Sequence, residues 1–201
     1  MGVLGVVLSV FKNMKKAKKL KAMGAEEILK LNDFDFYDAV ECLCDAAVYD
    51  INDSGLTQEQ RYVHTLIRLE AEVNNGGLCQ FFVNSSKECA PFVRDALNEI
   101  GATQLSDYFI KFVNENNIDV NDLSMFNIQS VDEFAALSES CDFDKFDDRF
   151  YEDEDLHQQI LDYARENIYK LIWNVVCILE IEYSYLVPQT LTQNLFHHTM
   201  V

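Results

Sequence analysis

Carboxylates are the side chains best suited to a chemical role in this sequence. From Asp132 to Asp155, eleven of them stand against two cations, Lys145 and Arg149. Carboxylates on successive helical turns lie about 5 to 10 Å apart, comparable to the phosphates along a duplex. Such a surface could bind a basic protein, or it could simply keep the chain soluble. The predicted contact residues are Asp38, Glu41, Asp45, Asp142, Asp144, Asp147, Asp148, Glu152, Asp153, Glu154 and Asp155.

A second polar cluster surrounds the Asn-Asn-Gly-Gly run at residues 74–77. Its side chains could line the pocket of an enzyme. Alternatively, the run ends a helix and the neighbouring side chains support that end with hydrogen bonds, which we favour because Asn and Gly commonly end helices. The residues concerned are Glu70, Glu72, Asn74, Asn75, Gln80 and Asn84.

No catalytic, metal or cofactor site is expected. Cys42 and Cys44 are two residues apart, so on a helix their thiols point about 200° apart and cannot bind one ion together. No Lys-Ser or Lys-Thr follows Gly76 and Gly77, as a phosphate-binding loop would require. The serines lack the strand-turn-helix context of a hydrolase nucleophile. We therefore predict a non-catalytic protein whose six Cys are reduced core thiols.

Helices must position these side chains, because the chain has only two Pro and seven Gly and its apolar residues recur every three to four positions. Capping boxes at 57–60 and 130–133 predict two helix starts, and Thr103 is expected to cap another helix. The predicted fold class is all-α, a single compact multi-helix domain. Its helices are expected over residues 36–51, 57–73, 78–83, 91–100, 103–113, 130–137 and 156–179.

The acidic stretch also contains aromatic residues at helical spacing. They are Phe143, Phe146, Phe150 and Tyr151. We expect all four to anchor the segment in the core while its carboxylates face water.

Charge is unevenly distributed along the chain. The formal net charge is -18, yet residues 1–30 hold seven Lys against Glu26 and Glu27 and so carry +5. We expect a basic N-terminal helical arm over residues 1–30, an acidic helical domain over 31–170, and a C-terminal extension over 171–201 that ends in an uncharged tail. The acidic domain repels nucleic acid and anionic lipid, so no direct nucleic-acid ligand is expected.

The sequence predicts a cytoplasmic protein. The apolar run at residues 2–11 is followed by lysines, the reverse of the order in a secretory signal peptide. It is also shorter than the about 20 residues that span a bilayer. The arm could lie on an anionic membrane as an interfacial helix, but we favour packing on its own acidic domain or on a neighbouring subunit.

The segment at residues 70–85, with the run EVNNGGLCQFF, resembles the signature of a bacterial family typified by DNA mimic protein 19. Further resemblance lies at residues 56–60, 97–102 and 146–151, so that about residues 33–168 are covered. Leu78 and Cys79 replace residues that are more often aromatic or polar in that family. The signature residues, which we expect to be structural, are Glu72, Asn74, Asn75, Gly76, Gly77, Gln80, Phe81 and Phe82.

The resemblance implies an all-helical fold, frequent dimers and, for the characterised member, an acidic surface that occupies the DNA-binding face of a repressor-type transcription factor. Our leading hypothesis is an acidic interaction protein that sequesters a basic DNA-binding protein such as a transcriptional regulator. The alternative is an immunity-type protein that neutralises a nuclease toxin with the same surface. A third hypothesis is an enzyme with a pocket around residues 70–80. The identity of the partner and the oligomeric state stay open.

Overall fold

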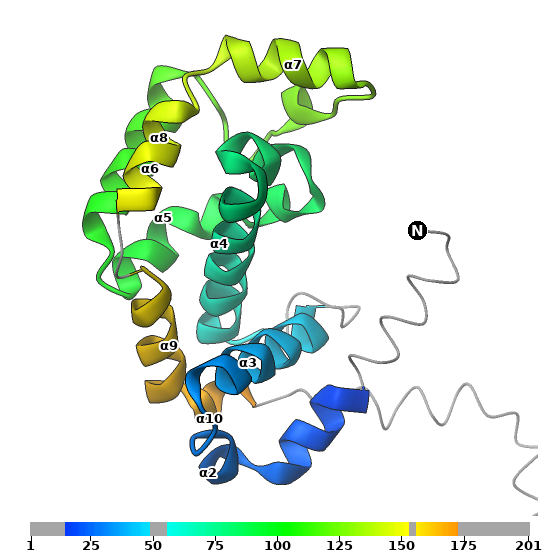
Figure 1. The fold of residues 1–201 in the computed structure, drawn as a ribbon, viewed down its shortest axis with the longest axis vertical. Helices are drawn as coiled ribbons and strands as arrows, with labels where there is room; N and C mark the ends of the chain where they lie inside the picture. The colour runs from blue at the N-terminus through cyan, green and yellow to red at the C-terminus, as the bar shows by residue number, and fades with distance from the viewer. Residues whose placement is uncertain (1–14, 49–55, 153–155, 173–201) are drawn as a thin grey trace, which may run out of the picture.

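The computed structural model describes residues 15–48, 56–152 and 156–172, and within these ranges it contains helices and no strand. This confirms the predicted all-α fold class (Figure 1). The elements in chain order are α2 (Ala25–Ile28), α3 (Asp33–Val48), α4 (Gln58–Val83), the 3-10 helix η2 (Ser85–Cys89), α5 (Ala90–Glu99), α6 (Thr103–Glu115), the 3-10 helix η3 (Ser124–Phe126), α7 (Val131–Ser140), α8 (Asp144–Glu152), α9 (Leu156–Glu166) and α10 (Ile168–Leu171).

Helix α4 is the central element of the fold, and it packs against α3, α5, η2, α8, α9 and α10 (Figure 1). Its start is the predicted capping box. The Thr57 hydroxyl accepts a hydrogen bond from the Gln60 amide at 3.1 Å, and the Gln60 side-chain oxygen accepts one from the Thr57 amide at 2.9 Å. Gln60 also donates to the Leu171 carbonyl at 2.9 Å, so the same cap holds α10 on the start of α4.

The predicted break after the Asn-Asn pair is a kink within α4. Gly76 (φ -167°, ψ 24°) and Gly77 (φ 78°, ψ 175°) are both non-helical, and two helical segments meet there. The conformation of Gly77 is one that only glycine adopts readily. The separate short helix expected over residues 78–83 is therefore the second segment of α4, and it buries Phe81 and Phe82 completely.

Aromatic side chains form the core where α4, α6 and α8 meet. The ring centroid of Phe82 lies 4.7 Å from that of Phe126 and 6.3 Å from those of Phe109 and Phe112. Phe146 of α8 contacts both α6 rings, at 6.1 and 6.4 Å. Aromatic pairs at such distances stabilise a core beyond the area that they bury. This cluster fixes α8 against α6.

One prediction about an aromatic residue holds only in part, and one about a capping residue is wrong. Tyr151 is not buried in the core, since its side chain is 56% exposed, but it anchors α8 on α4 because its hydroxyl donates to the Val73 carbonyl at 2.7 Å. Thr103 does not cap α6. The turn at Gly101 (φ 87°) brings the chain into the helix early, so Ala102 occupies the N-cap and Thr103 is already the first helical residue.

The helix expected over residues 156–179 is interrupted at Asn167 (φ -108°, ψ 12°), where α9 has ended and α10 begins. The Tyr163 carbonyl accepts hydrogen bonds from both the backbone amide of Asn167, at 3.1 Å, and its side-chain amide, at 3.0 Å, so Asn167 closes the last turn of α9. Ser130 is the N-cap of α7, as predicted, and its hydroxyl accepts from the Glu133 amide at 3.2 Å. The second half of the predicted capping box differs, because the Glu133 side chain accepts from the Gln129 amide and not from that of Ser130. Helix α7 continues to Ser140, beyond the expected end. Residues 173–179 lie outside the described ranges.

The described part of the N-terminal arm packs on the helical domain. Residues 15–23 are helical up to a break at Gly24, Ala17 and Leu20 are buried, and Lys16 forms an ion pair with Asp38 of α3. The apolar run at residues 2–11 and the uncharged tail from residue 183 lie outside the described ranges. Within those ranges, no helix combines the length and apolarity needed to cross a membrane.

Candidate functional site

The three candidate carboxylates of α3 are paired with cations of the same chain. Asp38 pairs with Lys16, and Arg68 of α4 contacts both other side chains. The Nη2 atom of Arg68 lies 2.5 and 2.6 Å from the two carboxylate oxygens of Asp45 and 3.2 Å from Glu41 Oε1. The Asp45 side chain is only 14% exposed. Glu41 and Asp45 therefore hold α3 on α4, and Asp38 holds the N-terminal arm on α3. All three charges are compensated within the chain.

The electrostatics of Asp45 agree with this structural role. Burial raises the pKa of its carboxyl, but the hydrogen bonds and positive charges of His64 and Arg68 outweigh burial and leave the pKa below its usual value. Charged hydrogen bonds of this kind are about twice as strong as neutral ones. Asp45 thus stays ionised and bound to its own chain.

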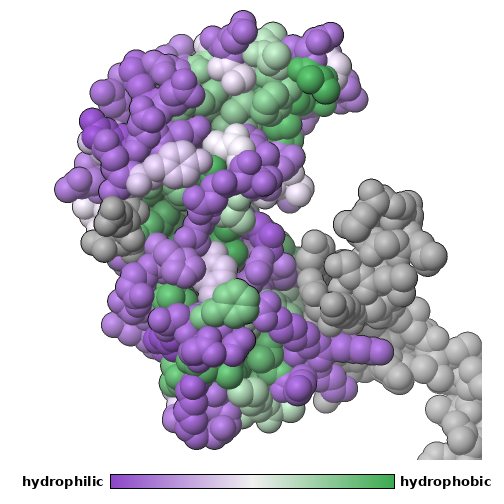
Figure 2. All heavy atoms as spheres, in the orientation of Figure 1, coloured by the Kyte–Doolittle hydropathy of each residue, from purple (hydrophilic) through white to green (hydrophobic). Residues whose placement is uncertain are grey.

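The candidate carboxylates near α8 differ from one another in their pairing. Asp142 lies 2.5 Å from Lys145, and Glu152 lies 2.5 Å from Arg149. Asp144 and Asp148 are exposed and form no ion pair within the described ranges, although Glu152 and, to a smaller extent, the charge of Asp148 raise the pKa of the neighbouring Arg149. Figure 2 shows hydrophilic surface over α8. The remaining candidates, Asp153, Glu154 and Asp155, lie outside the described ranges.

Asp147 points inward, contrary to the expectation that the acids of this stretch face water. Its Oδ1 accepts a hydrogen bond from the Leu78 amide at 2.8 Å, just beyond the kink of α4. Burial raises the pKa of Asp147, the Leu78 hydrogen bond lowers it, and the charges of Asp144 and Asp148 raise it again. Asp147 therefore acts as an N-cap supplied by another helix, because the first amide groups of a helical segment have no intrahelical acceptor.

Replacing Asp147 by alanine is expected to lower the free energy of unfolding by about 1 to 3 kcal/mol, because the Leu78 amide loses its acceptor. Asp147→Asn keeps an oxygen at that place and removes the repulsion by Asp144 and Asp148. Its effect should stay within about 0.5 kcal/mol. Urea denaturation followed by circular dichroism measures both changes. Equal losses of unfolding free energy in the two variants would show that the Leu78 hydrogen bond does not account for the contribution of Asp147 to stability.

The candidate contact residues thus form two groups, one on α3 and one near α8, and these two helices pack on different parts of α4. Those of α3 bind near Arg68, whereas α8 contacts α4 near its kink, at Val73 and Leu78 (Figure 1). Of the two groups, only the one near α8 contains exposed carboxylates without a cation partner in the described ranges. That group is the candidate partner-binding surface, which we define as Asp144 and Asp148.

Glu72 is the shared hydrogen-bond acceptor of the polar cluster at residues 70–84. Glu72 accepts hydrogen bonds from the side chains of Gln80 at 2.7 Å, Asn84 at 2.8 Å and Ser86 at 2.7 Å. Burial raises the pKa of Glu72, but these three hydrogen bonds outweigh it and leave the pKa below its usual value. Asn74 and Asn75 are exposed at the kink. Of the two interpretations, the geometry supports a helix break that is braced by hydrogen bonds and not the pocket of an enzyme.

Glu70 has partners that sequence reasoning missed. Tyr37 of α3 donates to Glu70 Oε2 at 2.6 Å, and His157 Nδ1 of α9 lies 2.9 Å from Oε1. The Tyr37 and His157 rings also lie 4.8 Å apart. Burial and the Glu70 charge raise the pKa of Tyr37 well above its usual range. Glu70 lies on the face of α4 that the apolar spacing buries, so its carboxylate could be expected to need hydrogen-bond donors. No residue close in sequence indicated which helices supply these donors.

Cysteines are buried at each of the described positions, 42, 44, 79, 89 and 141, and none of these five forms a disulfide. Burial raises the pKa of Cys42, Cys79 and Cys89 to about 11. Cys177 lies outside the described ranges. Within them, no group of three or more His, Cys, Asp or Glu side chains is arranged to hold a metal ion.

Comparison with known proteins adds one finding. The sequence model of the DMP19-like protein family matches residues 54–167, which is more than half of the 201-residue chain. The matched range contains the kink of α4, the braced polar cluster and α8. No curated protein and no solved structure matches the chain.

Proposed function

Because the chain belongs to the DMP19-like protein family, we propose that it is a non-catalytic, DNA-mimic-type protein that sequesters a basic DNA-binding protein such as a transcriptional regulator. The observation that carries this proposal is the pair Asp144 and Asp148 on α8, both exposed and without a cation partner in the described ranges. Residues four apart lie on one face of a helix, about 6 Å apart along its axis. A basic surface can therefore contact both charges at once.

The family signature serves the fold in this proposal. Gly77 and Glu72 form and brace the kink of α4, and Asp147 links that kink to α8. The position of α8 thus depends on the kink, while Asp144 and Asp148 are exposed at its surface. This division supports a structural role for the signature and a binding role for the candidate partner-binding surface.

The charge of the whole chain supports the same function. A formal net charge of -18 attracts a basic partner over distances within a Debye length, about 8 Å at physiological ionic strength. Such attraction raises association rates and weakens as salt is added. If these carboxylates occupy the positions of DNA phosphates, binding to the basic partner should weaken with added salt, and duplex DNA should compete for the same partner.

Replacing Asp144 and Asp148 together by asparagine is expected to weaken binding to the partner at least about tenfold, equal to about 1.4 kcal/mol, because two uncompensated charges leave the interface. The partner is first captured on the tagged chain from an extract of the source organism, with and without added duplex DNA, and identified by mass spectrometry. Its affinity is then measured for the parent and the double variant.

The control variant is Glu88→Gln with Asp95→Asn, which removes two exposed charges from η2 and α5 and gives the same net charge. It should bind the partner nearly as tightly as the parent. Equal weakening in both double variants would mean that only net charge matters. Capture that duplex DNA does not compete with would remove DNA mimicry as the function.

The same experiment distinguishes the proposal of a regulator-binding protein from the alternative of an immunity-type protein. A captured nuclease whose DNA cleavage is inhibited by the parent, and less by the Asp144 and Asp148 variant, would replace the regulator as the partner class. The acidic surface suits either partner, since both must bind phosphates.

A further inference from the structure

The helix over residues 15–23 of the N-terminal arm, drawn in blue in Figure 1, has two different faces. Ala17 and Leu20 are 0% and 8% exposed, so one face packs on the helical domain. Successive residues of a helix are about 100° apart, which places three exposed lysines on the opposite face. We call them the outer lysines, and they are Lys15, Lys18 and Lys19. The arm thus packs on its own domain and still presents a basic face outward.

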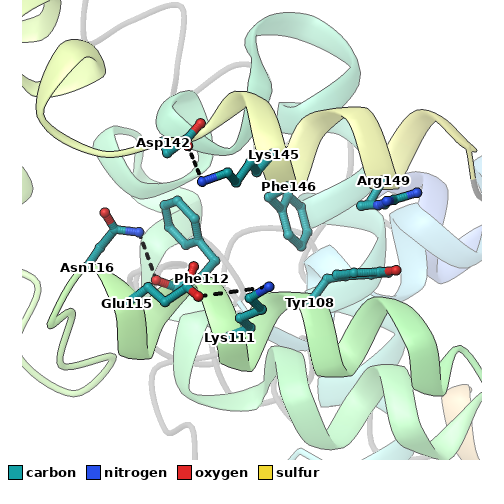
Figure 3. A pocket seen from close by; sticks show the side chains of 9 residues that line it. All are labelled: Tyr108, Lys111, Phe112, Glu115, Asn116, Asp142, Lys145, Phe146 and Arg149. Atoms are coloured by element: carbon teal, nitrogen blue, oxygen red, sulfur yellow. Dashed lines mark hydrogen bonds and ion pairs between the residues drawn. The ribbon is translucent and has the colours of Figure 1, made fainter.

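The outer lysines form no ion pair within the described ranges. The exposed lysines of α6 and α8 differ in this respect. Figure 3 shows Lys111 paired with Glu115 and Lys145 paired with Asp142, where α6 and α8 face each other. In a chain of formal net charge -18, three neighbouring cations without a carboxylate partner are available to an anionic surface outside the chain.

The carboxylates near the arm cancel little of this positive charge. Four of the five acids of α3 are already compensated by cations of the chain. The pairs are Asp33 with Arg165, Asp38 with Lys16, and both Glu41 and Asp45 with Arg68. The exposed acids of α8 lie at the other end of the molecule (Figure 1). Charges separated by more than a Debye length, about 8 Å at physiological ionic strength, are largely screened.

The sequence that precedes the outer lysines is apolar. Residues 2–11 contain no charged side chain, and seven of these ten residues are Val, Leu or Phe. An apolar run beside a basic helix face is the combination that binds the surface of a bilayer, since apolar groups enter the boundary of the acyl chains while lysines contact anionic headgroups. Nucleic acid would offer phosphates to the lysines but no apolar phase to residues 2–11, so a bilayer engages both parts of the arm.

We propose that the N-terminal arm attaches the chain to the surface of an anionic lipid bilayer. The outer lysines contact the headgroups, and residues 2–11 supply the apolar contact. Each lysine held at an anionic leaflet raises the affinity on the order of fivefold. Because α8 lies away from the arm, an attached chain keeps the candidate partner-binding surface accessible (Figure 1). The proposal does not rest on DNA mimicry, since it uses the cations of the arm and not the carboxylates of α8.

The test is co-sedimentation of the full chain with vesicles of phosphatidylcholine and phosphatidylserine in a two-to-one ratio, compared with vesicles of phosphatidylcholine alone. We expect binding to the anionic vesicles to be at least about tenfold tighter and to weaken as salt is added. Replacing all three outer lysines by glutamine should lower the affinity at least about tenfold, because three headgroup contacts are lost. Circular dichroism checks that this variant stays folded.

The matched control combines Arg94→Gln, Lys111→Gln and Lys145→Gln, which remove three exposed cations outside the arm and give the same net charge. It should bind the anionic vesicles nearly as tightly as the parent. Equal weakening in the two triple variants would overturn the proposal, because net charge alone would then govern binding. Equal binding of the parent to both kinds of vesicle would overturn it as well.

A second variant tests the apolar contact without changing charge. Val7→Gln with Leu8→Gln should weaken binding to the anionic vesicles at least about tenfold, because two apolar side chains of the run become polar. Unchanged binding would overturn the part assigned to residues 2–11. Binding to duplex DNA that is tighter than binding to the vesicles, and that is lost with the outer lysines, would replace the bilayer by nucleic acid.

Discussion

Replacing Gly77 by alanine is expected to lower the free energy of unfolding by about 3 kcal/mol. Two costs combine in this value. The backbone at φ 78° and ψ 175° is a conformation that side chains avoid, and an added methyl group would overlap the Asp147 carboxylate. Moving Asp147 aside would break its hydrogen bond to Leu78. Denaturant titration followed by circular dichroism measures the loss, and a change below about 1 kcal/mol would mean that the kink tolerates a side chain.

Gly76→Ala is the matched control for this variant. Gly76 has φ -167°, which any residue adopts, and its added methyl group would meet the side-chain oxygen of Gln80. That side chain is flexible, so it can move at the cost of its hydrogen bond to Glu72. We expect a loss of about 1 kcal/mol, clearly smaller than that of Gly77→Ala.

Glu72→Ala should cost about 2 to 3 kcal/mol, because three side-chain donors share this one charged acceptor. We expect a loss smaller than the sum for three independent hydrogen bonds, since Asn84 is exposed and its side chain can form a hydrogen bond with water instead. Equilibrium unfolding measures it. A loss within about 0.5 kcal/mol, the range of neutral surface substitutions, would mean that the cluster does not brace the kink.

Glu72→Gln tests the same carboxylate through pH. The folded protein lowers the pKa of Glu72, so its contribution is present above the pKa of the unfolded chain, about 4.3, and is lost as the pH falls through the folded pKa. The difference in unfolding free energy between parent and Glu72→Gln should therefore shrink as the pH falls from about 6 to about 3, a range that covers this window. A difference that stays constant over that range would contradict the lowered pKa.

Local rules predicted much of the fold. The capping box at Thr57 and the break at Gly76 and Gly77 each depend on residues close in sequence. The signature was also expected to be structural, and the hydrogen bonds of its side chains support that interpretation. Short-range geometry leaves few alternatives at such positions.

The candidate site was harder to predict, because charge pairing depends on the tertiary structure. Asp45 and Asp148 are both acids on helices, yet Arg68 neutralises the first from 23 residues away and no cation of the described ranges pairs with the second. Asp147 was grouped with the surface acids, although its acceptor role is fixed by the distant Leu78 amide. Sequence spacing shows where a carboxylate lies on its helix but not which donor it meets.

The contacts that hold the C-terminal helices on α4 also bear on the order in which the protein folds. Asp147 meets Leu78 across 69 positions, His157 meets Glu70 across 87, and Leu171 meets Gln60 across 111. Closing long loops costs chain entropy before such contacts can form, whereas α4, η2, α5 and α6 are consecutive and pack together locally. The neighbours α4, η2 and α5 can thus pack before the C-terminal helices dock. The Leu78 amide gains its acceptor only when α8 docks, whereas the Glu72 hydrogen bonds that brace the kink are local.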